Sequence, residues 1–236
     1  MFTKTAGFYD AIYSFKDYEG ASRTLTKLIQ TLDPAAKSLL DVGCGTGRHL
    51  QFLSENFDAS GFDLDAGLIK EARKRNPGLA LHVADMTNFD LGQKYDVITC
   101  LFSAIAYVET VERMRASIAC MARHLRPGGL LIIEPWFSPD TYWHGHLTGN
   151  FHDEPDLKIS WIYLNGREDD VSVLRIFYTV GSAQGVEQFE EVHRMGLFTD
   201  DDYRAALRDA GLECTHDAGG LFDRGLYIGT SAADPS

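Results

Sequence analysis

The chain has 236 residues, of which 44% are hydrophobic and 24% charged, a composition typical of one large globular domain or two small ones. Its formal net charge is −12, and this acidic balance excludes a bulk binder of nucleic acid or of anionic membrane surfaces. Any anionic substrate must therefore be met by a local group of cations.

The cysteines predict a protein of a reducing compartment. None of the four belongs to a CxxC pair or has the spacing of a zinc site, so we expect free thiols, no metal and a cytoplasmic location. The N-terminus lacks the apolar run of a signal peptide, and no stretch is apolar for long enough to span a membrane. These cysteines are Cys44, Cys100, Cys120 and Cys214.

Residues 1–33 have an irregular helical pattern that begins with an aromatic-rich segment. Apolar residues then recur at helical spacing and stop before Asp33 and Pro34, which predicts a helix of about three turns ending there. These apolar residues are Leu25, Leu28, Ile29 and Leu32.

A regular alternation of apolar strands and helices follows. It predicts right-handed crossovers and a parallel, doubly wound α/β sheet. The fifth strand is nearly all apolar, as expected of a strand covered on both faces. We predict strands at 38–42, 59–63, 80–83, 95–100 and 130–134, and a long helix at 111–125.

The pattern changes after Pro135. Residues 136–155 have the character of a loop, and three strand-like runs follow them, separated by turn signals at Asn165-Gly166 and at 182–185. We interpret 136–196 as an antiparallel β insertion that covers a substrate pocket or builds the interface of a homodimer. Its strands are predicted at 158–164, 171–180 and 186–195.

The last segment returns to the α/β pattern. Thr199 is placed to cap a helix that ends at Ala210-Gly211, and two strands are predicted at 212–216 and 225–230. With residues 34–135, the segment 197–236 then completes a Rossmann-like, mostly parallel seven-stranded sheet.

The strongest motif is a glycine-rich turn between the first strand and the first helix, Asp41-Val42-Gly43-Cys44-Gly45-Thr46-Gly47. Such a turn lets the backbone approach a nucleotide-like ligand. Its GxGxG spacing differs from the dinucleotide fingerprint, and it lacks the Gly-Lys-Ser/Thr of a phosphate loop. A tight turn without a ligand is the alternative interpretation of Gly43 and Gly45.

Three further motifs follow at ordered positions: Asp63 ends the second strand, Asp85-Met86 follow the third, and residues 125–129 form a turn before the fifth. With these motifs the chain resembles the class I methyltransferases that depend on S-adenosyl-L-methionine (SAM). The resemblance implies that Asp63 binds the ribose hydroxyls of SAM and that Asp85 and Met86 contact its adenine, although either aspartate could instead serve a strand end or a helix cap. The full set of donor-site residues implied is Tyr18, Asp41, Gly43, Cys44, Gly45, Gly47, Asp63, Leu64, Asp85, Met86 and Leu101.

A narrower resemblance covers the whole chain. The segments Lys16-Asp17-Tyr18, 102–105, 134–137, 197–199 and 224–227 are together similar to those of the N,N-dimethyltransferases of TDP-amino-sugars that complete desosamine and mycaminose. This resemblance implies methyl transfer to the amino group of a TDP-linked amino sugar, with residues 1–33 as a helical cap over the donor site. It implies a catalytic position for Tyr107 near the acceptor amine and places Tyr9, Lys16, Trp136 and Arg224 at the acceptor.

One departure concerns Phe2, which stands where the family has a tyrosine that faces the acceptor, if the two positions align. A hydroxyl would be lost there. For the diphosphate of a nucleotide-sugar, the candidate cations are Arg224, Lys16 and Arg175, in that order, because arginine can bind two phosphate oxygens at once.

Methyl transfer from a sulfonium to a neutral amine is an in-line displacement, and positioning alone can lower its barrier by roughly 7–11 kcal/mol. Because water can take the amine proton, a base such as Tyr107 is not required. A hydroxyl acceptor would need a base, for which His144, His146, His152 and His193 are candidates. The alternatives are thus methylation of another small-molecule amine or hydroxyl, or a noncatalytic SAM-binding protein.

Overall fold

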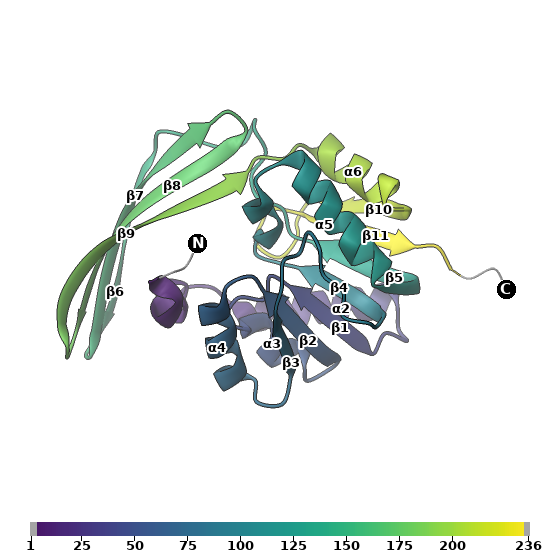
Figure 1. Cartoon of the computed structure of the whole chain (residues 1–236), viewed down its shortest axis with the longest axis horizontal. Coiled ribbons are helices and arrows are strands. Elements are labelled where there is room, and N and C mark those ends of the chain that lie inside the picture. Colours follow the sequence, from purple (N-terminus) through teal and green to yellow (C-terminus); the bar gives the residue numbers. More distant parts are fainter. Residues whose placement is uncertain (1–3, 234–236) are drawn as a thin grey trace.

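The computed structural model describes residues 4–233, which form two β-sheets with a short N-terminal helical segment between them (Figure 1). The larger sheet has seven strands in the order β10-β11-β5-β4-β1-β2-β3. Five are parallel, and β11 pairs antiparallel with both β5 and β10. Its strands are β1 (Ser38–Val42), β2 (Asp58–Asp63), β3 (Ala80–Val83), β4 (Tyr95–Cys100), β5 (Leu125–Ile133), β10 (Leu212–Asp217) and β11 (Leu226–Ser231).

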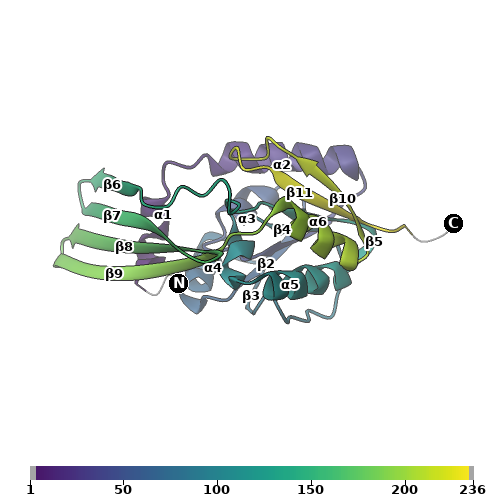
Figure 2. The ribbon, with the colours of Figure 1, turned by 90° about the horizontal axis from the view of Figure 1, so that it is seen from above.

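Helices cover both faces of this sheet, as Figure 2 shows for α2 and α5. Alternate side chains of a strand point to opposite faces, so Leu39 packs in a core with residues of α2, and Leu40 packs in a second core with residues of α5 and α6. The helices are α2 (Tyr18–Leu32), α3 (Arg48–Leu53), α4 (Ala66–Arg75), α5 (Val111–Arg123) and α6 (Asp200–Asp209). This confirms the predicted doubly wound α/β class.

Capping and proline signals predict correctly where two of the helices end or begin. Helix α2 ends at Leu32, just before Asp33-Pro34, and the side chain of Thr199 accepts from the backbone N–H of Asp202 in a capping box that starts α6. Strand β5 begins earlier than predicted, because residues 126–129 form a bulge in its pairing with β4 instead of a separate turn.

The second sheet is antiparallel, in the order β6-β7-β8-β9. Its strands are β6 (Leu147–Glu154), β7 (Leu157–Glu168), β8 (Val171–Ser182) and β9 (Gly185–Gly196). The prediction of a loop throughout 136–155 was wrong, since β6 pairs with β7 over its whole length. Leu147 and Phe151 are the only large apolar residues among the eight of β6, too few to reveal the alternation of a strand.

The predicted turn at Asn165-Gly166 was also wrong. Asn165 is buried and pairs with Leu174 inside the β7–β8 hairpin, whose turn lies at Asp169-Asp170. Asp169 has a φ of 50° there, a left-handed conformation that aspartate tolerates better than most residues. The turn at 182–185 was predicted correctly.

The two faces of this sheet differ. The inner face carries a cluster that includes Ile159, Trp161 and Ile176 and packs against Ile12 of the short helix α1 (Tyr9–Ile12), which follows a 3-10 turn, η1 (Thr5–Phe8). The outer face exposes large apolar side chains, namely Leu147, Phe151, Ile162, Leu164 and Phe177.

Polar contacts hold the N-terminal segment between the two sheets. Asp10 of α1 accepts from the Thr46 hydroxyl at 2.8 Å and pairs with Arg75 of α4. Glu191 of β9 accepts from the Thr5 hydroxyl at 2.6 Å. The segment is therefore fixed to the glycine loop on one side and to the four-stranded sheet on the other.

Two further properties concern the chain as a whole. All four cysteines are free thiols, and Cys100 and Cys120 are buried. No helix within residues 4–233 is long and apolar enough to cross a membrane.

Candidate active site

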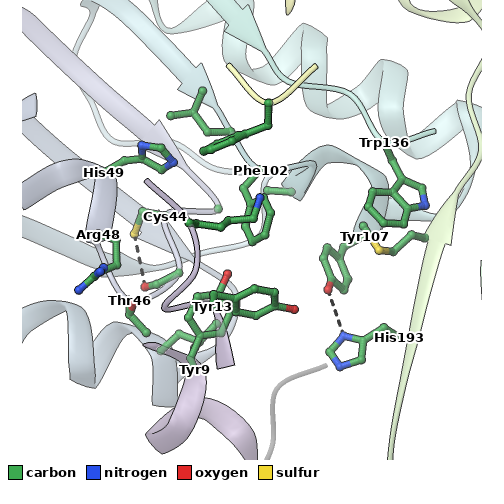
Figure 3. Close-up of a pocket in the computed structure, with 18 of the residues that line it drawn as sticks. Tyr9, Tyr13, Cys44, Thr46, Arg48, His49, Phe102, Tyr107, Trp136 and His193 are labelled. Atoms are coloured by element: carbon green, nitrogen blue, oxygen red, sulfur yellow. Dashed lines mark hydrogen bonds between the residues drawn. The ribbon is translucent and has the colours of Figure 1, made fainter. Parts of the chain in front are cut away.

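A cavity of about 1000 Å³ lies where the carboxyl ends of β1, β2 and β4, the N-terminal segment and the inner face of the four-stranded sheet meet. We call the part beside residues 41–49 the glycine-loop end, and the part beside Tyr107, Trp136 and His193 the insertion end (Figure 3). The structure brings nearly all predicted site residues into one wall: Tyr9, Lys16, Tyr18, Asp41, Gly43, Cys44, Gly45, Asp63, Leu64, Asp85, Met86, Leu101, Tyr107, Trp136 and Arg224.

The three glycines of the loop all have positive φ, between 57° and 71°, but they serve different purposes. A Cβ on Gly43 would come within 2.7 Å of the Ala104 Cβ, so the loop packs closely there. A Cβ on Gly45 would meet no described atom within 4 Å, which leaves space for a ligand beside the backbone.

Gly47 is the one predicted donor-site residue that does not line the cavity. A Cβ there would come within 2.5 Å of the Asn76 side-chain nitrogen, which also donates to the Gly47 carbonyl at 3.0 Å. This glycine therefore permits close packing between the start of α3 and the end of α4, and its predicted contact with SAM stays a prediction.

Asp63 sits at the carboxyl end of β2 and holds the glycine loop. One carboxylate oxygen accepts from the backbone N–H of Gly45 and the other from that of Asp65, both at 2.9 Å. Burial raises the pKa of Asp63, and these backbone donors oppose the shift. Its oxygens retain lone pairs, so it can still accept from ligand hydroxyls.

Asp85 and Asp41 are in different surroundings. Asp85 is partly exposed and accepts from the backbone N–H and hydroxyl of Thr87, so it forms a local turn as well as lining the cavity. Asp41 is buried beneath the loop and accepts from the Thr99 hydroxyl at 2.8 Å. Burial raises the pKa of Asp41 to about 7.

Two residues at the glycine-loop end were missed by the sequence analysis, Arg48 and His49 at the start of α3. The Arg48 guanidinium lies 5.1 Å from the ring centroid of Tyr18, and His49 Nδ1 is 3.1 Å from the Ser22 hydroxyl. Among the described residues, Arg48 Nε and His49 Nε2 are buried without a hydrogen-bond partner. Burial lowers the pKa of His49 to about 3, so its ring is neutral.

These features fit SAM, which has a nucleoside and an amino-acid carboxylate. The space beside Gly45 and the carboxylate of Asp63 suit the nucleoside, and the unpartnered nitrogens of Arg48 and His49 suit the carboxylate. The signal that could have located Arg48 and His49 is their position, directly after the last loop glycine.

At the insertion end, Tyr107 comes from a 3-10 turn, η2 (Ala104–Val108), and its hydroxyl is 3.0 Å from Nδ1 of His193 on β9. The loop before η2 is held in an uncommon conformation, with φ of 51° at Phe102 and 61° at Ser103. Trp136 is fixed by a 3.0 Å hydrogen bond from its indole N–H to the Ser172 hydroxyl.

His193 is the only one of the four candidate bases that lines the cavity. It is buried, with 2% of its surface exposed, whereas His144, His146 and His152 lie outside the cavity wall. The structure also adds Tyr13, whose ring lies 4.6 Å from that of Tyr9. Phe2 lies outside the described residues.

A third group combines cations, aromatic rings and one buried carboxylate. Lys16 Nζ lies 3.4 Å from the ring centroid of Phe102, and the Arg224 guanidinium lies 5.4 Å from that of Trp136. Glu134 is fully buried, accepts from the Phe102 backbone N–H at 2.6 Å and approaches Arg224 Nε at 3.7 Å. Burial and the neighbouring Arg224 lower the pKa of Lys16.

Arg175 does not join this group. Its position on the outer face of the four-stranded sheet pairs it with Glu190, and it does not line the cavity. Alternation along β8 explains this, because Arg175 follows the inward-facing Leu174. Within residues 4–233, no group of three or more His, Cys, Asp or Glu side chains could hold a metal ion.

Comparison with known proteins agrees with this geometry. Residues 39–129 match the model of a methyltransferase domain family. The chain is 39% identical to a dTDP-4-amino-2,3,4,6-tetradeoxy-D-glucose N,N-dimethyltransferase of Saccharopolyspora spinosa, over 95% of this chain and 91% of that protein. It is 35% identical to a dTDP-3-amino-3,4,6-trideoxy-alpha-D-glucopyranose N,N-dimethyltransferase of Streptomyces venezuelae, over 96% and 98% of the two chains.

Solved structures give the same result. The crystal structure of DesVI from Streptomyces venezuelae superposes with a TM-score of 0.92 at 34% identity and covers 98% of this chain and 99% of its own. SAM-bound CalS10, an amino pentose methyltransferase from Micromonospora echinaspora, superposes with a TM-score of 0.88 at 36% identity, over 95% and 97%. The chain therefore belongs to the family of SAM-dependent sugar N-methyltransferases and is an enzyme that transfers methyl groups to nitrogen.

Proposed function

We propose that this enzyme methylates the amino group of a TDP-linked amino sugar. The observation that carries the proposal is the presence of two partly buried cations, Lys16 and Arg224, in the wall of the cavity that also contains the glycine loop. A cation taken out of water needs a counter-charge. Glu134 supplies one negative charge to this pair, and the diphosphate of a nucleotide-sugar would supply more.

At the glycine-loop end, we assign SAM to the wall formed by residues 41–45, with the ribose on Asp63 and the adenine beside Asp85 and Met86. Arg48 and His49 would bind the carboxylate of its amino-acid part. When bound, SAM supplies a methyl group activated by a positively charged sulfur. The short helix α1, held to Thr46 through Asp10, would close the N-terminal cap over this end.

At the insertion end, we assign the acceptor sugar to the space between Tyr9, Tyr107 and Trp136, with its diphosphate on Arg224 and Lys16. This division gives the chain two tasks. It holds an uncharged amine in line with the methyl group, and it excludes water with aromatic side chains. Such positioning can account for most of the acceleration of an in-line displacement.

A product assay tests the proposal. Labelled SAM would be offered with a panel of TDP-amino-sugars, the matching free amino sugars, simple amines and phenols, and the products identified by mass spectrometry. We expect methylation of TDP-amino-sugars above all other classes. Methylation of phenols alone would contradict amine chemistry, equal rates with free amino sugars would contradict a nucleotide-bound acceptor, and SAM binding without any product would support a noncatalytic binder.

We also infer that two copies of the chain associate through the outer face of the four-stranded sheet. Leu147, Ile162, Leu164 and Phe177 are each more than half exposed on that face, which is unusual for a sheet that faces water. Light scattering should give the mass of a dimer, and Phe177→Glu should give a monomer. A monomeric parent chain would exclude this interface.

We place this activity in the cytoplasm, with small molecules as its only substrates. Four free thiols suit a reducing compartment, and a net charge of −12 disfavours nucleic acid.

A further inference from the structure

Three side chains form a row at the insertion end: Glu191 and His193 on β9, both buried, and Tyr107 on η2, which is partly buried. The Tyr107 hydroxyl is 3.0 Å from His193 Nδ1, and His193 Nε2 is 3.6 Å from a carboxylate oxygen of Glu191. Glu191 and His193 are 4% and 2% exposed. Only Tyr107 and His193 reach the cavity, so Glu191 acts on a ligand through them.

Glu191 is held as an ionised acceptor. Its Oε1 accepts from the backbone N–H groups of Lys4 at 2.7 Å and Thr5 at 3.1 Å, and its Oε2 accepts from the Thr5 hydroxyl. Burial alone would raise the pKa of Glu191, but His193, Thr5 and the two backbone donors lower it to about 2. A carboxylate at neutral pH therefore faces the imidazole.

This carboxylate determines which atom donates and which accepts in each contact along the row. Since an ionised carboxylate only accepts, the ring nitrogen that faces it, Nε2, carries the proton. In a neutral imidazole the other nitrogen, Nδ1, is then an acceptor, and the Tyr107 hydroxyl must donate to it. The phenol proton thus points toward β9, and the oxygen can accept from a donor in the cavity.

We propose that Glu191 and His193 are positioning residues that keep the Tyr107 oxygen an acceptor for an N–H of the substrate amine. This rests on the proposed amine acceptor. An amine held by its N–H keeps its own lone pair for the methyl carbon. That lone pair forms the new N–C bond, the electrons of the broken C–S bond go to sulfur, and the resulting ammonium loses its proton to water. Tyr107 keeps its proton throughout.

The opposite orientation would inhibit the reaction. A phenol whose O–H pointed into the cavity would donate to the amine lone pair, which is the pair needed for attack. The proposed orientation also limits the number of transfers. A neutral primary amine and its monomethyl product each have an N–H for Tyr107, whereas a neutral dimethylated amine has none.

The variant Glu191→Gln should reverse the direction of the hydrogen bonds along this row. The amide oxygen must take the place of Oε1, because two backbone N–H groups donate there, so the amide NH₂ takes the place of Oε2 against His193. The Thr5 hydroxyl can turn to accept from it. His193 would then carry its proton on Nδ1 and donate to Tyr107, which drives the phenol proton into the cavity.

Nitrogen-15 NMR of histidine-labelled protein shows directly, without substrate, which ring nitrogen of His193 carries the proton. We expect the neutral Nε2–H tautomer of His193 in the parent chain and the Nδ1–H tautomer in Glu191→Gln. An Nδ1–H tautomer or a doubly protonated ring in the parent chain would overturn the proposal, whatever the assay panel shows. Methylation of no amine at all, with the expected tautomers, would instead overturn the proposed function.

Kinetics give the second readout. Glu191→Gln should lower kcat by about tenfold to a hundredfold, because a loss of this size corresponds to one or two hydrogen bonds in the transition state. The Kd for SAM should be unchanged. Tyr107→Phe should slow the parent chain but leave Glu191→Gln unchanged or faster, because it removes the inhibitory donor. If the double variant instead lost kcat by the product of the two single losses, the proposal would be contradicted. Glu190→Gln, the neighbouring position on the outer face, is the matched control and should be as active as the parent.

Discussion

The glycine-loop end and the insertion end line one cavity but depend on different parts of the sequence. At the glycine-loop end, the cavity wall is built mainly from residues 41–49 and from the ends of neighbouring strands. At the insertion end, side chains from segments far apart in the chain meet, as when Tyr107 contacts His193 across 86 positions. A continuous motif can be recognised in a sequence, whereas such a meeting requires the fold.

The largest effect should come from breaking the glycine-loop end. Asp63→Ala removes the proposed ribose acceptor and the partner of the Gly45 N–H. Since hydrogen bonds to charged groups contribute about 1.5–3 kcal/mol each, SAM should bind on the order of 1000-fold more weakly by calorimetry. Asp58→Ala, at the exposed start of the same strand, is the control. Unchanged SAM affinity in Asp63→Ala would remove this residue from the donor site.

At the insertion end, a substitution should weaken the binding of one class of acceptor selectively. Arg224→Ala should raise the KM for a TDP-amino-sugar about 100-fold and the KM for the matching free amino sugar much less, because only the nucleotide-sugar carries a diphosphate. Steady-state kinetics with both acceptors measures the ratio. Arg175→Ala, whose side chain is on the outer face, should leave both values unchanged. Equal losses with both acceptors would show that Arg224 has only a structural role.

Lys16 should add a smaller, pH-dependent contribution. Burial and Arg224 lower its pKa, so a fraction of the folded protein holds Lys16 neutral at moderately alkaline pH, and an entering anion restores the proton. Binding of TDP at about pH 8 should therefore take up protons, measured by calorimetry in two buffers of different ionisation enthalpy. Lys16→Met should abolish the uptake and weaken binding about tenfold. Uptake that persists in Lys16→Met would assign it to another group.

The smallest expected effect concerns stability beneath the glycine loop. Because burial raises the pKa of Asp41 from 3.8 to about 7, the folded state holds its proton more tightly than the unfolded state. Stability should thus fall as pH rises from about 4 to 7 and level off above. Asp41→Asn keeps an acceptor for Thr99 and removes this slope, so it should be more stable at about pH 8 by on the order of 1 kcal/mol. Denaturant unfolding measures the free energy of unfolding at each pH. If the parent chain and Asp41→Asn gave parallel curves against pH, Asp41 would not be the group responsible.

Sequence patterns located the elements that depend on local signals. The cap at Thr199, the end of α2 before Asp33-Pro34 and the strands of the parallel sheet follow from residues that are neighbours in the chain. The same patterns failed at β6 and at Asn165-Gly166. Strand β6 has only two large apolar residues, and an Asn-Gly pair that usually marks a turn is instead paired within a hairpin.

For the site, the sequence by itself determined the glycine loop, the carboxylates at the strand ends and the family to which they point, because each is a short-range pattern. It could not show that Gly47 serves helix packing, that Arg175 points outward, or that Arg48 and His49 line the cavity and have buried, unpartnered nitrogens. Tertiary structure also decided which of four candidate histidines meets Tyr107. The physical reason is that burial, side-chain direction and proton position depend on neighbours that only folding brings within a few ångströms.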